Sequence, residues 1–326
     1  MPLLEVNQLA TEFDTDEGVV RALDRVSFSI EPGETLGIVG ESGCGKSVTA
    51  LSIMRLLPQP MGRIVAGEVL FRGRDLVREP IAEMEAIRGN HIGMVFQEPM
   101  TALNPVHTVG RQLAEVLYLH KDISKDQALR ECVEMLDKVG IPSPDVRMGE
   151  YPHQLSGGMR QRVVIAMALA CQPSLLIADE PTTALDVTIQ AQILELIKEL
   201  QNDMGMAVML ITHDLGVIAE TSNSVVVMYA GKVAEQGNVY EIFDNPSHPY
   251  TRGLLDSIPK LETVPKSELS TIEGMVPGLL DLPVGCRFEN RCPRRKESCK
   301  AAPPPIEVIA GSHQVSCYEW SKSVNE

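Results

Sequence analysis

A glycine-rich run near the N-terminus carries the residue types that bind a phosphate chain. It reads Gly-Glu-Ser-Gly-Cys-Gly-Lys-Ser over residues 40–47 and matches the P-loop pattern, with an apolar run before it and a helical pattern after it. Glycines let backbone N–H groups and the start of the next helix face an anion. Lys46 would reach the β- and γ-phosphates and Ser47 would ligate Mg²⁺, whereas an ordinary glycine turn would not explain this Lys-Ser pair. The predicted nucleotide contacts here are Gly40, Ser42, Gly43, Cys44, Gly45, Lys46, Ser47 and Val48.

Two adjacent carboxylates are the second group of residues, after the glycine-rich run, that could take part in chemistry. Residues 175–181, Leu-Leu-Ile-Ala-Asp-Glu-Pro, form an apolar run that ends in both acids. A buried parallel strand would deliver them to its carboxyl edge. Asp179 is then placed to hold Mg²⁺, and Glu180 to orient or deprotonate an attacking water. Two acids that merely end a surface strand are the alternative, which the P-loop in the same chain makes less favourable.

The elements that must position these residues can be read from apolar periodicity. Four runs predict the strands of a parallel core, at residues 35–40, 91–96, 174–179 and 207–212. Three strand-like runs lie at 3–9, 21–30 and 66–73, and two short strands with a glycine turn lie at 225–237. Amphipathic spacing predicts helices between residues 98 and 170. The pattern indicates an α/β fold.

Composition limits the class of protein. The chain has 326 residues, of which 44% are hydrophobic, so it can bury a large core and form more than one domain. A net charge of −15 argues against a general nucleic-acid binder, and no nucleic-acid partner is expected. The N-terminus shows no secretory signal pattern, and apolar runs such as 163–171 are shorter than the roughly 20 residues of a membrane span. We expect a cytoplasmic protein.

Residues 154–173 give the chain a family resemblance. Leu-Ser-Gly-Gly-Met, then Arg-Gln-Arg and an apolar helix, resembles the signature motif of ABC-type ATPases. Ser156, Gly157 and Gly158 precede a helix whose free N–H groups could bind a phosphate. In that family the phosphate belongs to ATP held by the P-loop of another subunit. The resemblance therefore implies a dimer with two ATP molecules at its interface.

Further motifs follow in the order of that family. Gln97 ends the run 91–97, Asp186 ends Thr-Thr-Ala-Leu-Asp, and His213 follows the run 207–212. The resemblance implies that Gln97 lies near Mg²⁺ and the lytic water, that Asp186 lies at the dimer interface, and that His213 contacts the γ-phosphate. Taken singly, they could be a surface amide, a helix cap and a core histidine. Phe13 lies where the family places an aromatic that stacks on adenine, with core packing as the alternative.

The resemblance also implies an architecture. It is that of a P-loop NTPase of the ABC type, with a RecA-like core, an antiparallel β subdomain, an inserted helical subdomain and a small Cys-rich C-terminal extension. Residues 1–245 would form the nucleotide-binding domain, with the helical subdomain at about 98–170. Residues 246–326 would form the extension, with a metal-cluster region at 286–317.

Three stretches narrow the resemblance to the dipeptide, oligopeptide and nickel importers. They are residues 98–105, 151–159 and 244–255. The implied function is ATP hydrolysis that powers peptide import at the cytoplasmic face of the bacterial inner membrane. The implied partners are two membrane permease subunits, an extracytoplasmic solute-binding protein and a second, non-identical ATPase subunit. Import of nickel or another small solute, and a soluble ABC ATPase without a transport role, remain alternatives.

Seven cysteines are distributed unevenly along the chain. Cys132 and Cys171 lie in apolar helical patterns and are expected to be buried small hydrophobes, and Cys44 is expected to be a small loop residue. The other four follow a proline-punctuated linker at 258–283 that predicts a separate small unit, which a metal centre could organise. In a reducing compartment such clustered cysteines favour metal over disulfides.

The ligand set of that centre leaves alternatives open. The resemblance implies one [4Fe–4S] cluster on Cys286, Cys292, Cys299 and Cys317. Zinc is the rival, with His313 as a substitute ligand, although five, six and seventeen intervening residues exceed the usual C-x₂₋₄-C spacing. A solvated basic patch with incidental cysteines is another alternative, and the basic side chains alone could equally mark a docking surface. The basic residues expected to offset cluster charge are Arg287, Arg291, Arg294, Arg295, Lys296 and Lys300.

Overall fold

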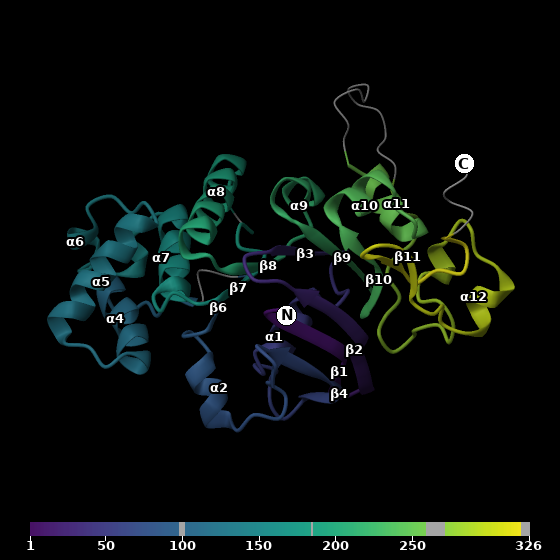
Figure 1. Ribbon diagram of the computed structural model, residues 1–326, viewed down its shortest axis with the longest axis horizontal. Coiled ribbons are helices and arrows are strands. Elements are labelled where there is room, and N and C mark those ends of the chain that lie inside the picture. Colours follow the sequence, from purple (N-terminus) through teal and green to yellow (C-terminus); the bar gives the residue numbers. More distant parts are fainter. Residues whose placement is uncertain (98–101, 184, 259–270, 321–326) are drawn as a thin grey trace. The chain divides into compact units, whose positions relative to one another are not determined.

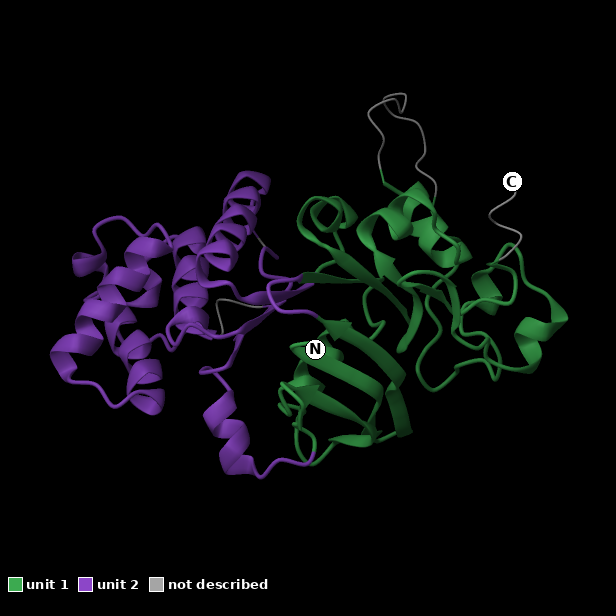
Figure 2. Cartoon of the chain, in the orientation of Figure 1, with its two compact units in different colours: residues 1–30, 35–77, 212–326 green, residues 31–34, 78–211 purple. Residues whose placement is uncertain are grey.

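The computed structural model describes residues 1–97, 102–183, 185–258 and 271–320 (Figure 1). The chain divides into two compact units (Figure 2). Unit 1 contains residues 1–30, 35–77 and 212–326, and unit 2 contains residues 31–34 and 78–211. Half of the stretch used for the importer resemblance after Gln97, one residue of the 182–186 motif and part of the predicted linker lie outside the described residues.

An antiparallel sheet in unit 1 confirms the strands predicted near the N-terminus. Its order is β2-β1-β4-β5. The bounds are β1 Leu4–Thr15, β2 Gly18–Ile30, β4 Gly62–Phe71 and β5 Arg74–Asp75. Leu4 of β1 lies opposite Ile30 of β2 and Phe71 of β4, and all three are buried. This sheet thus has a shared apolar face on which it packs.

The second sheet of unit 1 begins with the strand that leads into the P-loop. Strand β3 pairs in parallel with β9, and β9 forms an antiparallel hairpin with β10, which confirms the two strands predicted at 225–237. The bounds are β3 Thr35–Val39, β9 Ser224–Tyr229, β10 Lys232–Asn238, β11 Glu307–Ala310 and β12 His313–Val315. The helices are α1 Lys46–Ile53, α9 Leu215–Thr221, α10 Val239–Asp244, α11 Pro249–Asp256 and α12 Glu297–Ala301. Every residue of β3 is buried, as expected of a strand inside a layered α/β unit.

The prediction that the C-terminal tail forms a separate small unit is wrong. Strand β12 pairs antiparallel with β10, so that Glu235 lies opposite Val315, and β11 adds to the outer side of β12. The buried Glu235 carboxylate accepts backbone N–H groups of Ser247 and His248 and bonds His313 Nε2 at 2.7 Å. A buried carboxylate requires such partners, so the tail is part of the packing of unit 1.

Unit 2 combines three parallel strands with the predicted helices. Strand β7 pairs with β6 and with β8, and both β7 and β8 are buried throughout. The bounds are β6 Ile92–Val95, β7 Leu175–Asp179 and β8 Ala207–Ile211. The helices are α2 Ile81–Ile87, α4 Val109–His120, α5 Lys125–Lys138, α6 Pro144–Arg147, α7 Gly157–Leu169 and α8 Val187–Met204. Helices α4 and α5 lie beside α7, and α6 lies beside α5 (Figure 1), which confirms a helix-rich segment before residue 170.

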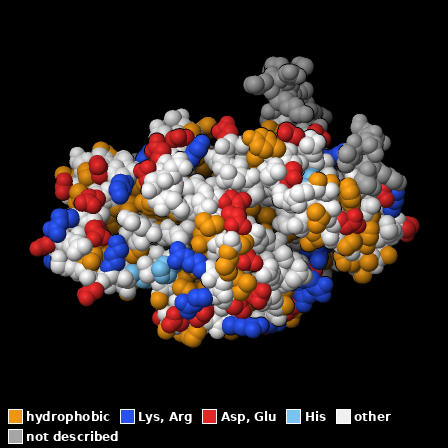
Figure 3. Space-filling model, in the orientation of Figure 1, with side chains coloured by type: hydrophobic (Ala, Val, Ile, Leu, Met, Phe, Trp, Pro, Cys, Tyr) orange, Lys and Arg blue, Asp and Glu red, His pale blue; other side chains and the backbone are white. Residues whose placement is uncertain are grey.

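Acidic and basic side chains intermingle on the face drawn in Figure 3. Within the described ranges, no helix combines the length and the apolar character needed to cross a membrane.

Cys132 and Cys171 are buried, with exposed fractions of 0% and 8%, and burial raises the pKa of both thiols, which confirms them as core residues.

Candidate functional site

The P-loop connects β3 to α1 and depends on glycine for its shape. Gly40, Gly43 and Gly45 have φ angles of 151°, 77° and 103°, which L-residues with a side chain rarely adopt. A Cβ on Gly40 would collide with the carbonyl oxygen of Met228 and lie 2.7 Å from Cys44 Sγ. The loop is therefore compact, with its backbone pressed against β9.

Lys46 begins α1 and lies against the loop that precedes it. Its side chain is buried, and Nζ donates to the carbonyl oxygens of Gly40 at 2.8 Å and Glu41 at 3.2 Å. The ammonium group thus lies inside the curl of the loop. Cys44 is fully buried and burial raises the pKa of its thiol, which agrees with a packing role and disfavours a nucleophile.

In unit 2, two predicted residues, Gln97 and Glu180, meet Thr183, which was not predicted, just after the end of β7. Gln97 Nε2 donates to Glu180 Oε2 at 2.9 Å, and Thr183 Oγ1 donates to the same oxygen at 2.9 Å. Asp179 is buried at the last position of β7. Glu180 has a φ of 48°, in the left-handed region, and such strained residues cluster at functional sites. The structure therefore holds the Glu180 carboxylate in a defined orientation.

The residues of the signature motif and of the 182–186 motif begin two neighbouring helices of unit 2. Ser156 caps α7 by accepting the N–H of Met159, and Asp186 caps α8 by accepting the N–H of Ile189. A Cβ on Gly158 would lie 3.1 Å from the Ile189 side chain, so α7 and α8 approach closely there. Within one subunit, Ser156 and Asp186 therefore both serve as helix N-caps.

Gln161 makes a buried contact that the sequence did not reveal. It is fully buried on α7, and its Nε2 donates to the carbonyl oxygen of Pro181 at 2.5 Å. This bond joins the signature helix to the turn that follows Glu180. A glutamine within a helix gives no sequence signal for such a contact, because the partner is a backbone carbonyl set by the fold.

The remaining predicted residues lie in unit 1. His213 is exposed between β8 and α9, where the side chain of the next residue, Asp214, caps α9. Phe13 of β1 is partly buried and packs on Gly62, whose Cβ position lies 2.9 Å from the ring. Lys46, Ser47 and His213 thus belong to unit 1, and Gln97, Asp179 and Glu180 belong to unit 2.

Comparison with known proteins shows the family of the chain. Residues 23–183 match the ABC transporter family, and residues 234–299 match the C-terminal region of oligopeptide/dipeptide transporters. A probable peptide ABC transporter ATP-binding protein of Sinorhizobium fredii is 54% identical over 99% of this chain and 96% of its own length. The chain belongs to the ABC transporter ATP-binding family. The dipeptide transport ATP-binding proteins DppD of Bacillus subtilis and Escherichia coli are 54% and 48% identical, over 97% and 98% of this chain and 94% and 97% of their own lengths.

A solved structure agrees with this ABC-type ATPase fold. The dimeric ATP-binding cassette MJ0796 bound to ADP and Pi matches with a TM-score of 0.65 and 28% identity, over 72% of this chain and 98% of its own. The resemblance inferred from the signature motif is therefore confirmed, and ATP hydrolysis with Mg²⁺ is the activity that goes with the family.

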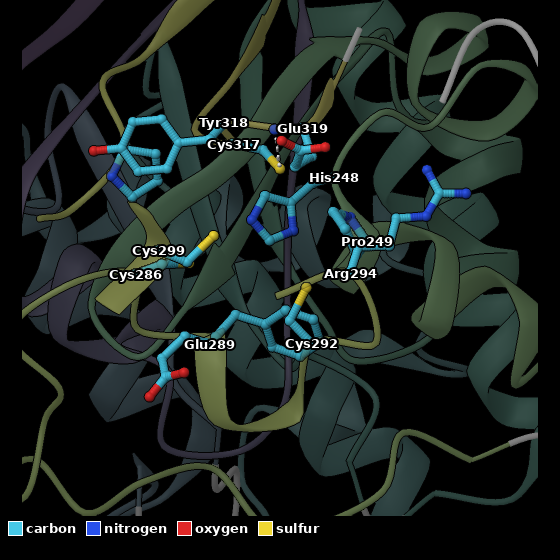
Figure 4. Close-up of a pocket in the computed structure, with 12 residues that line it drawn as sticks. His248, Pro249, Cys286, Glu289, Cys292, Arg294, Cys299, Cys317, Tyr318 and Glu319 are labelled. Atoms are coloured by element: carbon cyan, nitrogen blue, oxygen red, sulfur yellow. Dashed lines mark hydrogen bonds between the residues drawn. The ribbon is translucent and has the colours of Figure 1, made fainter. Parts of the chain in front are cut away.

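The ABC-type ATPase carries a cluster of cysteine side chains in its tail. Cys286, Cys292, Cys299 and Cys317 line one pocket together with His248 and Phe288 (Figure 4). Burial raises the pKa of Cys286 to about 12 and that of Cys317 to about 11, and it also raises the pKa of Cys292. One short segment, residues 286–299, and Cys317 thus bring four thiols to the same pocket.

Local contacts bring these cysteines together. The N–H of Cys286 donates to the carbonyl oxygen of Cys299 at 2.7 Å, and a Cβ on Gly285 would collide with that same oxygen. His248, which the sequence did not single out, is buried, and burial lowers its pKa to about 4, so its ring is neutral at physiological pH. The described residues contain no group of three His, Cys, Asp or Glu side chains arranged to hold a metal ion.

Two expectations about the tail need correction. His313, expected as a substitute zinc ligand, is absent from the pocket lining and bonds Glu235 instead. Four of the six basic residues expected to offset cluster charge have carboxylate partners of their own, whereas Arg294 and Arg295 act against burial to lower the pKa of Cys292. The ion pairs are Arg287 with Asp24, Arg291 with Glu41, Lys296 with Glu319 and Lys300 with Glu297.

Proposed function

We propose that the chain is the ATP-hydrolysing subunit of an importer for dipeptides or oligopeptides. The observation that carries the proposal is the identity of about half of all residues, over nearly the full length, with ATP-binding proteins of peptide and dipeptide transporters. The match of residues 234–299 to the oligopeptide/dipeptide C-terminal region supports the same substrate class. The chain works at the cytoplasmic face of the membrane with two permease subunits and an extracytoplasmic solute-binding protein.

In the proposed mechanism, the motif residues take the roles that the family resemblance implies. The P-loop and the buried Lys46 bind the β- and γ-phosphates. Ser47 and Asp179 would hold Mg²⁺, which would neutralise charge that develops on the phosphates. Glu180 accepts a proton from the attacking water, and Gln97 and Thr183 fix the orientation of its carboxylate. His213 contacts the γ-phosphate, and Phe13 stacks on the adenine.

A second ATPase subunit completes the site in this proposal. Ser156, Gly157 and Gly158 begin α7, a helix of 13 residues, and its N–H groups and positive dipole end suit the γ-phosphate of a nucleotide on the partner. Asp186, at the start of the neighbouring α8, lies at the same interface. The similar cassette structure is dimeric and bound to ADP and Pi, which supports an ATPase dimer here. In this proposal the partner is a non-identical paralogue.

Transport and cross-linking experiments test the substrate and the partners. A deletion strain should lose uptake of a labelled dipeptide and regain it with the wild-type gene, while uptake of ⁶³Ni²⁺ stays unchanged. Cross-links placed on α4 and α5 in native membranes should capture a membrane permease. Loss of nickel uptake with normal peptide uptake would favour a nickel importer, and purely soluble cross-link partners would favour a non-transport ATPase.

The four cysteines of the tail pocket suit a [4Fe–4S] cluster. In such a cluster each thiolate binds a different iron, so four sulfurs must line one cavity without crowding around one point. One tetrahedral Zn²⁺ would need Zn–S distances of about 2.3 Å, and hence three or four ligands close together. All four cysteines line one pocket, which supports the proposed cluster. The cluster would supply iron–thiolate bonds that hold residues 286–317 together.

Metal analysis decides this part of the proposal. Protein purified without oxygen should contain about four irons and four acid-labile sulfides per chain. The variant Cys292→Ser should lose most of both, whereas Cys132→Ser, a matched change at a buried cysteine of unit 2, should keep them. One zinc per chain and no sulfide would contradict the cluster.

A further inference from the structure

The cysteine loop, residues 286–292, contacts the P-loop through an ion pair. Arg291 Nη1 lies 2.6 Å from Glu41 Oε2, and Nη2 lies 3.0 Å from Glu41 Oε1, so the guanidinium and carboxylate meet in a two-point geometry. Glu41 is the second residue of the P-loop, and Arg291 is the immediate neighbour of Cys292. The Arg291 side chain is only 4% exposed. A paired, charge-assisted contact at such a buried position is strong and directional.

Other contacts fix the orientation of Arg291. Its Nε donates to the carbonyl oxygen of Glu273 at 3.0 Å, and Nη2 donates to that of Ile272 at 3.1 Å. The guanidinium carbon lies 5.8 Å from the centre of the Tyr229 ring, within cation–π range. Because the side chain is held on three sides, it can hold Glu41 in turn.

The backbone of the P-loop is held at two further points, Glu41 and Cys44. The N–H of Glu41 donates to the hydroxyl of the fully buried Tyr250 at 2.9 Å. At the other end, the N–H of Gly231 donates to the carbonyl oxygen of Cys44 at 2.8 Å. Arg287 supports that second contact, because it donates to the carbonyl oxygen of Ala230 and pairs with Asp24 at 2.8 Å.

An aromatic group joins these contacts to the cysteine pocket. The rings of Tyr229, Tyr250 and Phe288 lie with centroids 4.7 to 5.4 Å apart. Phe288 also lines the pocket formed by the four cysteines. A displacement of the cysteine loop would therefore move both the arginines and the aromatic packing behind the P-loop.

We propose that Arg291 is a positioning residue for nucleotide binding, through which the cysteine loop and the P-loop stabilise each other. The inference rests on the proposed binding of ATP at the P-loop. Glu41 brings a negative charge into a loop that binds a polyanion, and Arg291 neutralises that charge while it fixes the loop. By linkage, a contact that strengthens nucleotide binding is itself strengthened when nucleotide binds, so ATP should stabilise the cysteine loop.

Substitution of Arg291 tests the proposal in the full-length chain. Arg291→Met should weaken MgATP and MgADP binding about 10-fold, which corresponds to about 1.4 kcal/mol, measured by isothermal titration calorimetry. Arg295→Met is the matched control, because Arg295 is exposed and close in sequence, and its affinity should stay within twofold of wild type. The pair Glu41→Gln with Arg291→Met should recover much of the lost affinity, because the uncompensated carboxylate is removed.

Hydrogen exchange supplies a readout that a merely structural role would not change. In wild type, MgADP should slow amide exchange in residues 286–292 as well as in the P-loop, and in Arg291→Met the effect on 286–292 should disappear. An unchanged affinity in Arg291→Met, or exchange at 286–292 that ignores nucleotide in wild type, would overturn the inference. If wild type bound no nucleotide at all, the proposed function itself would fail, so the two failures are distinguishable.

Discussion

Replacement of Glu180 by glutamine separates chemistry from structure at the candidate catalytic carboxylate. Gln97 and Thr183 both donate to one oxygen of Glu180, Oε2, each at 2.9 Å. The amide oxygen of glutamine can accept both bonds in the same place. The variant therefore keeps the local arrangement and loses the proton-accepting group.

The structure allows the size of both effects to be worked out. A positioned general base contributes roughly 10²–10⁴-fold to a rate, which corresponds to about 2.7–5.4 kcal/mol in the activation free energy. Bonds to a charged acceptor are stronger than neutral ones by about 1 kcal/mol each, so the free energy of unfolding should fall by no more than about 2 kcal/mol. The loss of activity should therefore greatly exceed the loss of stability.

Steady-state phosphate release by the assembled complex, with ATP affinity measured in parallel, is the appropriate assay. Glu180→Gln should retain ATP affinity, release phosphate at less than about 1% of the wild-type rate, and accumulate an ATP-bound closed dimer. Glu195→Gln, the same change on the exposed face of α8, is the matched control and should hydrolyse ATP normally. Turnover within threefold of wild type in Glu180→Gln would refute the assignment of the base.

Three other substitutions test separate parts of the structure. Lys46→Ala should lose measurable ATP binding in calorimetry while the melting temperature changes little, and retained micromolar affinity would contradict a phosphate-binding lysine. Gly40→Ala should also abolish binding, because its Cβ would collide with the carbonyl oxygen of Met228; normal affinity would show that the loop has another shape. His313→Ala removes one partner of the buried Glu235 and should cost about 2 kcal/mol in chemical denaturation, with iron content preserved in the folded protein. A variant that lost iron but not stability would return His313 to the set of ligands.

The local motifs could be predicted because short-range geometry determines them. The glycines and the Lys-Ser pair of the P-loop lie within eight consecutive residues, so their spacing alone indicates a tight turn before a helix. The burial of β7 and the acids at its end follow from an apolar run of strand length. The clustering of four cysteines in the tail was also evident from their positions in the sequence, and in the structure all four line one pocket.

Pairings between distant residues were decided by the tertiary structure alone. Gln97 and Glu180 are 83 residues apart, His313 and Glu235 are 78 apart, and Arg291 and Glu41 are 250 apart. No local pattern distinguishes Arg291 from the other arginines of the tail, because its role depends on which carboxylate the packing of β9 and α11 brings within reach. The sequence by itself determined the chemistry available and the helices and strands that carry it. The tertiary structure decided which groups meet, because burial leaves each polar group only the partners that the fold places beside it.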